Sequence, residues 1–239
     1  MLSDTTVKKD LSYAFRIFSA LEMDDQTYTH ISSRSLSDQS SYWINPLGPF
    51  FEEICPENLV RLDSTGNQVE GSGVHNTTGQ SIHGSIYQSR PDINAIVHLH
   101  TPAGVAVSSL KCGLLFLSQF SFHFYNKIAI HSYGGLALDS TEENKIIKSL
   151  GSENKALLME NHGLLTVGKT IQEAFFYMYY LDMACQVQLK AMAAVAGDLD
   201  KIIFPGEMVC HKASQQMRDF EPSLGLRDWN ALVRKYIQK

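Results

Sequence analysis

The sequence predicts a single α/β domain in which helices surround a mostly antiparallel sheet. The chain has 239 residues, 44% of them hydrophobic, which suffices for one large domain with its own core. Segments with the period of a buried helix face are separated by short runs of strand-forming residues. Two of these runs flank a Ser-Thr-Gly-Asn turn at 64–67, which is typical of an antiparallel hairpin.

The first third of the chain predicts one helix followed by antiparallel strands. The helix begins at a cap on Ser3 or Asp4 and extends to residue 22, because Leu11, Phe15 and Phe18 recur at helical spacing. The elements that follow are strands at 27–33 and 42–45, a turn at 45–48, hairpin strands at 58–62 and 68–70, and a Gly-, Thr- and Asn-rich loop at 71–79.

Helices and strands alternate through the middle of the chain. In order, we expect a helix at 80–89, a strand at 93–99, a helix at 102–110, a strand at 127–130, a helix at 141–150, and strands at 155–159 and 163–167. Pro102 suits the first turn of its helix. Thr170 and Glu173 resemble a capping box that opens a long helix to about Ala196, which Gly197 ends.

The C-terminal part is less regular. After Gly197 the chain contains two prolines and two glycines before a short amphipathic helix near 227–236. The long preceding helix is apolar on several sides, so we expect it to be buried in the domain or against another subunit. We therefore predict one domain over residues 1–239, with a core at about 10–200 and an irregular C-terminal extension at 201–239.

Composition excludes several classes of protein. The net charge is −5 and no basic run exists, so we expect neither nucleic acid nor an anionic membrane as a partner. The longest apolar runs are too short to span a bilayer, and the first ten residues lack the apolar core of a signal peptide. The four cysteines are scattered, with no CxxC pair, which favours a reducing cytoplasm.

The strongest local signal for chemistry is His98-Leu99-His100 at the end of an apolar strand. Alternate residues of a strand share a face, so the two imidazoles project together. Catalytic zinc usually has three protein ligands and an open position. His162, at the end of another apolar strand, is the best candidate for the third ligand.

Other interpretations of these histidines remain open. An HxH pair arises by chance in a chain with nine histidines, and a histidine before a glycine is commonly a turn residue bonded to the backbone. His83 lies beside Ile82 and Ile86 in a predicted helix, which is typical of a core histidine. On the simplest interpretation, the remaining histidines are polar residues that make ordinary hydrogen bonds and bind no metal. No GxSxG motif or P-loop is present.

Several ordered motifs together resemble the class II aldolase/adducin family. They are His98-Leu99-His100 after Arg90-Pro91-Asp92, Glu160-Asn161-His162-Gly163-Leu164, Thr29–Ser32, Asn45–Gly48, the 60–67 hairpin and Ser81–Tyr87. The stretch from His98 through Leu115 is particularly similar to the head domain of adducins. We expect the chain to lack the long basic tail of adducins. The resemblance covers about residues 10–200.

The resemblance implies a three-layer α/β/α fold with a central antiparallel sheet. It also implies a homotetramer with the active site between neighbouring subunits, acting on a small-molecule substrate. In the family's aldolases the metal is zinc, bound at the positions of His98, His100 and His162, where it polarises a carbonyl or enediolate as a Lewis acid. Three-ligand sites with open positions also suit Fe²⁺ or another divalent metal.

One family residue that takes part in catalysis is missing. The family's sugar-phosphate aldolases carry a Ser-Ser-Glu run ahead of the helix that contains His83, and its glutamate serves as acid/base and metal ligand. Here the run reads Thr77-Thr78-Gly79. Loss of a general base costs about 10²–10⁴ in rate. Glu160, His30 and His83 are the candidates to replace it, and their alternative interpretations are a salt-bridged glutamate and core histidines.

The substrate loops also differ from those of the sugar-phosphate aldolases. In those aldolases a Thr-Gly pair after the proline binds the phosphate, whereas this sequence has Leu47-Gly48 and so lacks the hydroxyl. The family's asparagine in the early loop is replaced by His30. A non-phosphorylated substrate is therefore favoured. The positions that match substrate-binding loops are Asn45, Gly48, Thr77, Thr78 and Gly79.

Two functions follow as hypotheses. The first is a zinc-dependent lyase that performs aldol cleavage or decarboxylation on a small oxygenated carbonyl compound or acid. The second is a non-catalytic assembly module like an adducin head, in which the metal is structural or absent. We favour the enzyme, because packing three unpaired imidazoles together without a metal costs free energy.

Overall fold

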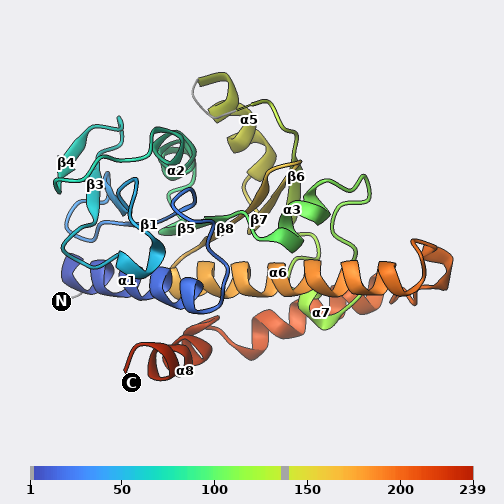
Figure 1. Cartoon of the computed structure of the whole chain (residues 1–239). Helices are drawn as coiled ribbons and strands as arrows, with labels where there is room; N and C mark the ends of the chain where they lie inside the picture. Colours follow the sequence, from blue (N-terminus) through green and yellow to red (C-terminus); the bar gives the residue numbers. More distant parts are fainter. Residues whose placement is uncertain (1–2, 136–139, 239) are drawn as a thin grey trace.

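The computed structural model describes residues 3–135 and 140–238. Its centre is an eight-stranded sheet in the order β4-β3-β2-β1-β5-β8-β7-β6 (Figure 1). The strands are β1 (His30–Arg34), β2 (Tyr42–Ile44), β3 (Val60–Leu62), β4 (Gln68–Glu70), β5 (Ala95–Leu99), β6 (Ile128–His131), β7 (Ala156–Met159) and β8 (Gly163–Gly168). Neighbouring strands are antiparallel except β6 and β7, which are parallel.

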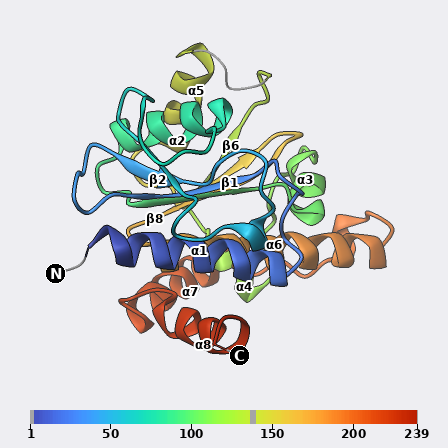
Figure 2. The ribbon, with the colours of Figure 1, turned by 60° about the vertical axis from the view of Figure 1, so that its left-hand side comes forward.

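Helices cover both faces of this sheet (Figure 2). The described helices are α1 (Asp4–Ala20), α2 (Thr77–Ser89), α3 (Pro102–Ser108), α4 (Gln119–Phe122), α5 (Ser140–Leu150), α6 (Ile171–Ala194), α7 (Glu207–Phe220) and α8 (Leu226–Tyr236), with short 3₁₀ turns at Phe51–Glu53 and Leu199–Lys201. Helices α2 and α5 lie on one face, and α1, α6 and α8 lie on the other. The predicted three-layer α/β fold is confirmed.

Two apolar cores result, one on each face of the sheet. Side chains of α1, α6 and α8 pack with one set of strand residues, including Val97 and Leu99. Side chains of α2 and α5 pack with the opposite set, including Ile96 and Leu165. Strand β5 lies between β1 and β8 and is buried along its whole length. His98 therefore shares the face of Ile96, toward α2.

Helix α2 begins earlier than the sequence predicts. The segment 71–79 was expected to be a loop, yet Thr77, Thr78 and Gly79 form the first turn of the helix. The reason is a local cap: the side-chain oxygen of Asn76 accepts hydrogen bonds from the backbone N–H groups of Thr78 and Gly79, 3.0 and 3.3 Å away. Thr78 and Gly79 therefore lie in a helix rather than in a loop.

The 14-residue helix α7 lies in the extension that the sequence predicts to be irregular. Only Cys210 and Ser214 of α7 are buried, and Met208 and Val209 are exposed. The buried and half-buried positions of α7, Cys210, Ala213, Ser214 and Met217, follow the helical period, but Ser214 is polar and exposed apolar residues interrupt this stripe in the sequence. The regular structure of 201–239 is therefore greater than we expected.

The long helix α6 agrees with the prediction in position and length. The Thr170 hydroxyl accepts from the Glu173 N–H, while the Glu173 carboxylate accepts from the N–H of Lys169, so only half of the expected capping box forms. Gly197, at φ +80°, follows its end. Although α6 has 24 residues, neither it nor any other described helix combines the length and apolar character needed to cross a membrane.

Candidate metal centre

His98 is held rigidly in the middle of the sheet. It is 1% exposed, and its Nδ1 lies 2.9 Å from the carbonyl oxygen of Leu164 on the neighbouring strand. A carbonyl only accepts, so Nδ1 carries the hydrogen and donates it. The Nε2 of His98 is therefore left with a lone pair, as a metal ligand requires.

His100 follows the end of β5 and is oriented by a carboxylate. Its Nδ1 lies 2.9 Å from Oδ2 of Asp25, a residue 75 positions earlier in the chain. The carboxylate accepts the Nδ1 hydrogen, so the Nε2 of His100 also presents a lone pair. No sequence signal singles out Asp25, because its role depends entirely on this long-range contact.

His162 lies on the three-residue connection between β7 and β8. Met159 pairs with Gly163 across the hairpin, and Asn161 takes the left-handed conformation at φ +53° that the tight connection needs. Gly163 permits a close approach to β5, because a Cβ there would lie 2.6 Å from the oxygen of Leu99 and 3.0 Å from a ring carbon of His100. The hairpin thus brings His162 against the other two rings.

The three imidazoles converge through their Nε2 atoms. The Nε2 of His98 lies 3.0 Å from that of His100 and 3.2 Å from that of His162, and all three ligand atoms lie within 4.8 Å of one another. Tetrahedral ligands about 2.0–2.1 Å from a zinc ion are roughly 3.3 Å apart. Two Nε2 lone pairs that face each other repel unless a cation lies between them, so this donor set fits a divalent metal.

Burial keeps two of these rings, those of His98 and His162, uncharged. It lowers the pKa of His98 well below its ordinary value and lowers that of His162 to about 4, with His100 adding to the effect in both. Neutral imidazoles bind metal ions without first losing a proton. At neutral pH these two rings are therefore ready to bind a metal.

His30 lies directly beside this cluster. It pairs with His98 across β1 and β5, and the two ring centroids are 5.0 Å apart. A Cβ at position 79 would lie 3.0 Å from two ring carbons of His30 and 3.3 Å from its Nε2. The His30 ring therefore occupies the space beside Gly79, and the absence of a side chain at 79 is what admits it.

A buried hydrogen-bond chain extends from His30 away from the cluster. His30 Nδ1 lies 2.9 Å from His83 Nε2, His83 Nδ1 lies 2.6 Å from the Ser32 hydroxyl, and that hydroxyl lies 2.8 Å from the hydroxyl of Tyr87. Burial lowers the pKa of His30 to about 3 and that of His83 well below its usual value. His83 thus contacts His30 rather than the metal cluster. The sequence gives no direct signal for Ser32 or Tyr87.

Glu160 lies beside the cluster but outside it. We expected Glu160 and His162 to share one face of an extended strand. The strand ends at Met159, and the left-handed Asn161 between them breaks the alternation. Glu160 instead lines a small cavity with His131, Tyr133 and His162, among others.

The expected substrate-loop residues lie at the N-terminal end of α2 and the turn facing it. Pro46 pairs with His75, which brings Gly48 and Thr77 to this region. The Asn45 side chain is committed to the backbone: Ile31 N–H donates to its oxygen, and its amide donates to the oxygens of Thr29 and Pro46. Asn45 therefore shapes the turn.

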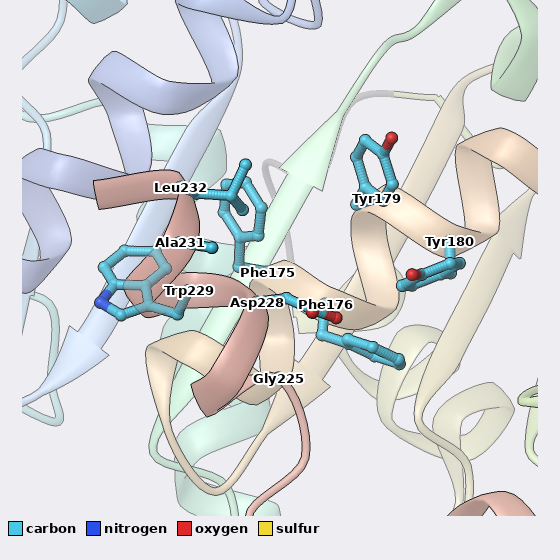
Figure 3. A pocket seen from close by; sticks show the side chains of 9 residues that line it. All are labelled: Phe175, Phe176, Tyr179, Tyr180, Gly225, Asp228, Trp229, Ala231 and Leu232. Atoms are coloured by element: carbon cyan, nitrogen blue, oxygen red, sulfur yellow. The ribbon is translucent and has the colours of Figure 1, made fainter. Parts of the chain in front are cut away.

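A separate apolar cavity of about 230 Å³ lies between α6 and α8, on the other side of the sheet (Figure 3). Phe176, Tyr180, Trp229 and Leu232 line it, and Asp228 is the only carboxylate among its described residues. Asp228 is ion-paired with Arg227. This cavity offers no second ligand for a metal.

Comparison with known proteins shows which family this chain resembles. The family model described as the class II aldolase and adducin N-terminal domain matches residues 9–189. Alpha-adducin of Rattus norvegicus is 35% identical over 235 residues, covering 94% of this chain and 32% of the adducin, so the chain spans about a third of that protein.

Two solved structures match over nearly the whole chain. An aldolase II superfamily protein from Pseudomonas syringae has 34% identity and a TM-score of 0.87, covering 98% of this chain and 92% of the other. An L-fuculose 1-phosphate aldolase from Glaciozyma antarctica has 29% identity and a TM-score of 0.81, covering 97% and 91%.

Proposed function

The chain belongs to the class II aldolase and adducin family, and from this premise we propose that it is a divalent-metal-dependent lyase. The reaction is aldol cleavage or decarboxylation of a small oxygenated carbonyl compound or acid. One observation carries the proposal: the Nε2 atoms of His98, His100 and His162 converge, and the first two have their Nδ1 hydrogens bound elsewhere. Zinc is the metal we favour, with Fe²⁺ as the other candidate.

His98, His100 and His162 would hold the metal, and Asp25 and the Leu164 carbonyl keep two of the rings in the ligating tautomer. A bound divalent cation would supply a Lewis acid for polarising a substrate carbonyl.

We assign the proton transfer to His30. Its ring lies beside that of His98, with centroids 5.0 Å apart, its Cδ2–Cγ edge lies toward Gly79, and His83 binds its Nδ1. His83 is therefore a positioning residue, which sets the tautomer of His30. Glu160 is the second candidate for the proton transfer, because it shares a small cavity with His162 and Tyr133.

The substrate class is a small hydroxy-carbonyl compound or β-keto acid. The related L-fuculose 1-phosphate aldolase is named for a phosphorylated sugar, but the hydroxyl expected of a phosphate loop is replaced by Leu47-Gly48 here. We expect the N-terminal turn of α2, with Thr77, Thr78 and Gly79, and the turn at Gly48 to border the substrate.

We also propose that the chain forms a homo-oligomer, a tetramer by family resemblance, in the cytoplasm. Large apolar side chains are exposed along 203–226, which supports burial against other copies: Ile203, Phe204, Met208, Val209, Phe220 and Leu226. The cysteines at 55, 112, 185 and 210 are free thiols, as expected in a reducing compartment.

The test combines metal analysis with a substrate screen. Protein purified without added metal is expected to contain about one divalent ion per chain, and His98→Ala is expected to lose it. Small aldols and β-keto acids, with and without phosphate, are screened for metal-dependent turnover. His211→Ala, which removes an exposed histidine of α7, is the matched control and is expected to retain both metal and activity.

The alternative function is the non-catalytic assembly module. The absence of a carboxylate at Gly79 and the similarity to alpha-adducin favour it. Stoichiometric metal with no turnover in the screen, together with assembly that survives His98→Ala, would support the module and reject the lyase.

A further inference from the structure

The hydrogen-bond chain that reaches the metal centre has a direction. Its contacts are Tyr87 hydroxyl to Ser32 hydroxyl at 2.8 Å, Ser32 to His83 Nδ1 at 2.6 Å, and His83 Nε2 to His30 Nδ1 at 2.9 Å. All four side chains are at most 5% exposed. Neither ring has a carboxylate partner among the described residues, so each buried ring carries one hydrogen. Each hydroxyl also has one hydrogen, so the direction of one bond fixes the others.

The Tyr87 end decides the direction. Ser32 is the only hydrogen-bond partner of the Tyr87 hydroxyl in the described part of the chain. A buried hydroxyl hydrogen needs an acceptor, so Tyr87 donates to Ser32. The single hydrogen of Ser32 then points at Nδ1 of His83. His83 therefore carries its hydrogen on Nε2 and donates it to Nδ1 of His30.

His30 is left with its own hydrogen on Nε2. This atom has no hydrogen-bond partner within residues 3–135 and 140–238, yet it is not one of the fully enclosed polar atoms without a partner. A small ligand can therefore reach it. The ring lies beside the metal centre, because its centroid is 5.0 Å from that of His98.

We propose that Ser32 is a positioning residue, which locks His30 in the form that presents Nε2–H to a substrate oxygen. Both ring nitrogens of His30 are then occupied, since Nδ1 accepts from His83 and Nε2 carries the hydrogen. His30 is therefore neither a fourth metal ligand nor a base for a substrate hydroxyl. Its part is that of the hydrogen donor, aimed at an oxygen on which negative charge develops.

This form of His30 separates the two reactions of the proposed function, on which this step rests. Aldol cleavage needs a base for the substrate hydroxyl, a role left to Glu160. Decarboxylation of a β-keto acid needs none: the bond from the α-carbon to the carboxylate breaks, its electron pair forms the enolate, and carbon dioxide leaves. The enolate oxygen accepts from His30 Nε2–H, and the α-carbon then takes a proton from water. We expect β-keto acids to be the preferred substrates.

The test locates the ring hydrogens in the metal-free full chain, labelled with ¹⁵N at the histidine rings. Solid-state ¹⁵N spectra distinguish a ring nitrogen that carries a hydrogen from one that does not. The signals of His30 and His83 are assigned by their loss in His30→Gln and His83→Gln. Near neutral pH we expect the hydrogen on Nε2 of both rings. A hydrogen on Nδ1 of His30 overturns the proposal.

Ser32→Ala and Tyr87→Phe form a matched pair, because each removes one hydroxyl from the chain. In Tyr87→Phe the Ser32 hydroxyl still donates to His83, so His30 is expected to keep its form. In Ser32→Ala nothing in the chain donates to His83 Nδ1, so a second form of His30, with the hydrogen on Nδ1, is expected to appear. Identical His30 signals in the two variants overturn the role of Ser32.

Turnover separates failure of this inference from failure of the lyase. If no aldol or β-keto acid is turned over while His30 shows the expected form, the lyase is rejected and the role of Ser32 stands. Turnover of β-keto acids that survives Glu160→Gln supports His30 as the hydrogen donor. Aldol cleavage that survives Glu160→Gln shows that His30 takes the hydroxyl proton, and it overturns the inference while the lyase stands.

Discussion

At the scale of single residues, the His30 ring fills the space that a side chain at position 79 would need. A Cβ at position 79 would approach the His30 ring to 3.0 Å, closer than such contacts normally allow. The two departures from the sugar-phosphate aldolase pattern are therefore coupled: a side chain at 79 fits only if the His30 ring shifts. This coupling is why we assign the proton transfer to His30.

The coupling is testable without knowing the substrate. Gly79→Glu alone is expected to destabilise the protein, because the new side chain overlaps His30. Adding His30→Asn frees the space, so the pair is expected to show a favourable interaction of about 1–3 kcal/mol in urea unfolding. Strictly additive effects would show that the two positions are independent. With a substrate in hand, His30→Asn alone is expected to lower kcat by about 10²–10⁴ while metal content is kept.

At the scale of elements, one strand and one hairpin assemble the centre. Alternation along β5 puts His98 on the α2 face, and His100 continues just beyond the strand end. The β7–β8 hairpin brings His162 to them through the left-handed Asn161. Asparagine tolerates this conformation better than most residues do.

Asn161 therefore gives a prediction about the hairpin. Asn161→Ala is expected to cost about 1–2 kcal/mol, because a left-handed alanine is strained, and to weaken metal binding by displacing His162. Asn161→Gly adopts the same φ without strain and is the matched control. Zinc competition with a chelator and urea unfolding measure the two effects. Equal metal affinity in both variants would mean that the hairpin conformation does not position His162.

At the scale of the whole molecule, several neutral histidines are buried in the fold. Burial lowers the pKa of His30 to about 3 and those of His123 and His162 to about 4, and it lowers those of His83 and His98 as well. In the unfolded chain a histidine has a pKa of about 6.5. Below that pH the unfolded state binds more protons than the folded state, so the free energy of unfolding falls as pH falls.

We predict that the metal-free protein is most stable above about pH 6.5 and loses stability progressively toward pH 4. His123 lies far from the metal centre, against Phe176 and Tyr180. His123→Phe removes one of the titrating groups, so proton uptake on unfolding is expected to fall by nearly one proton near pH 5, and by less at pH 4. Urea unfolding of chelator-treated protein across this range measures the slope. If the free energy of unfolding falls with pH equally steeply in the variant, His123 does not contribute to the loss of stability at low pH.

The sequence by itself determined the fold class, most helices and strands, and the His98/His100 pair. These features depend on local periodicity: alternation along β5, the apolar stripe of α1 and the turn at 64–67. The same periodicity did not reveal α7, where exposed Met208, Val209 and Phe220 interrupt the buried positions. It also missed the first turn of α2, which the Asn76 cap creates.

Only the tertiary structure decided what surrounds the three imidazoles. Asp25 meets His100 across 75 positions, and His30 meets His83 across 53. Sequence patterns report which face a residue takes within its own element. Hydrogen-bond partners, close approaches and burial arise from packing between elements far apart in the chain.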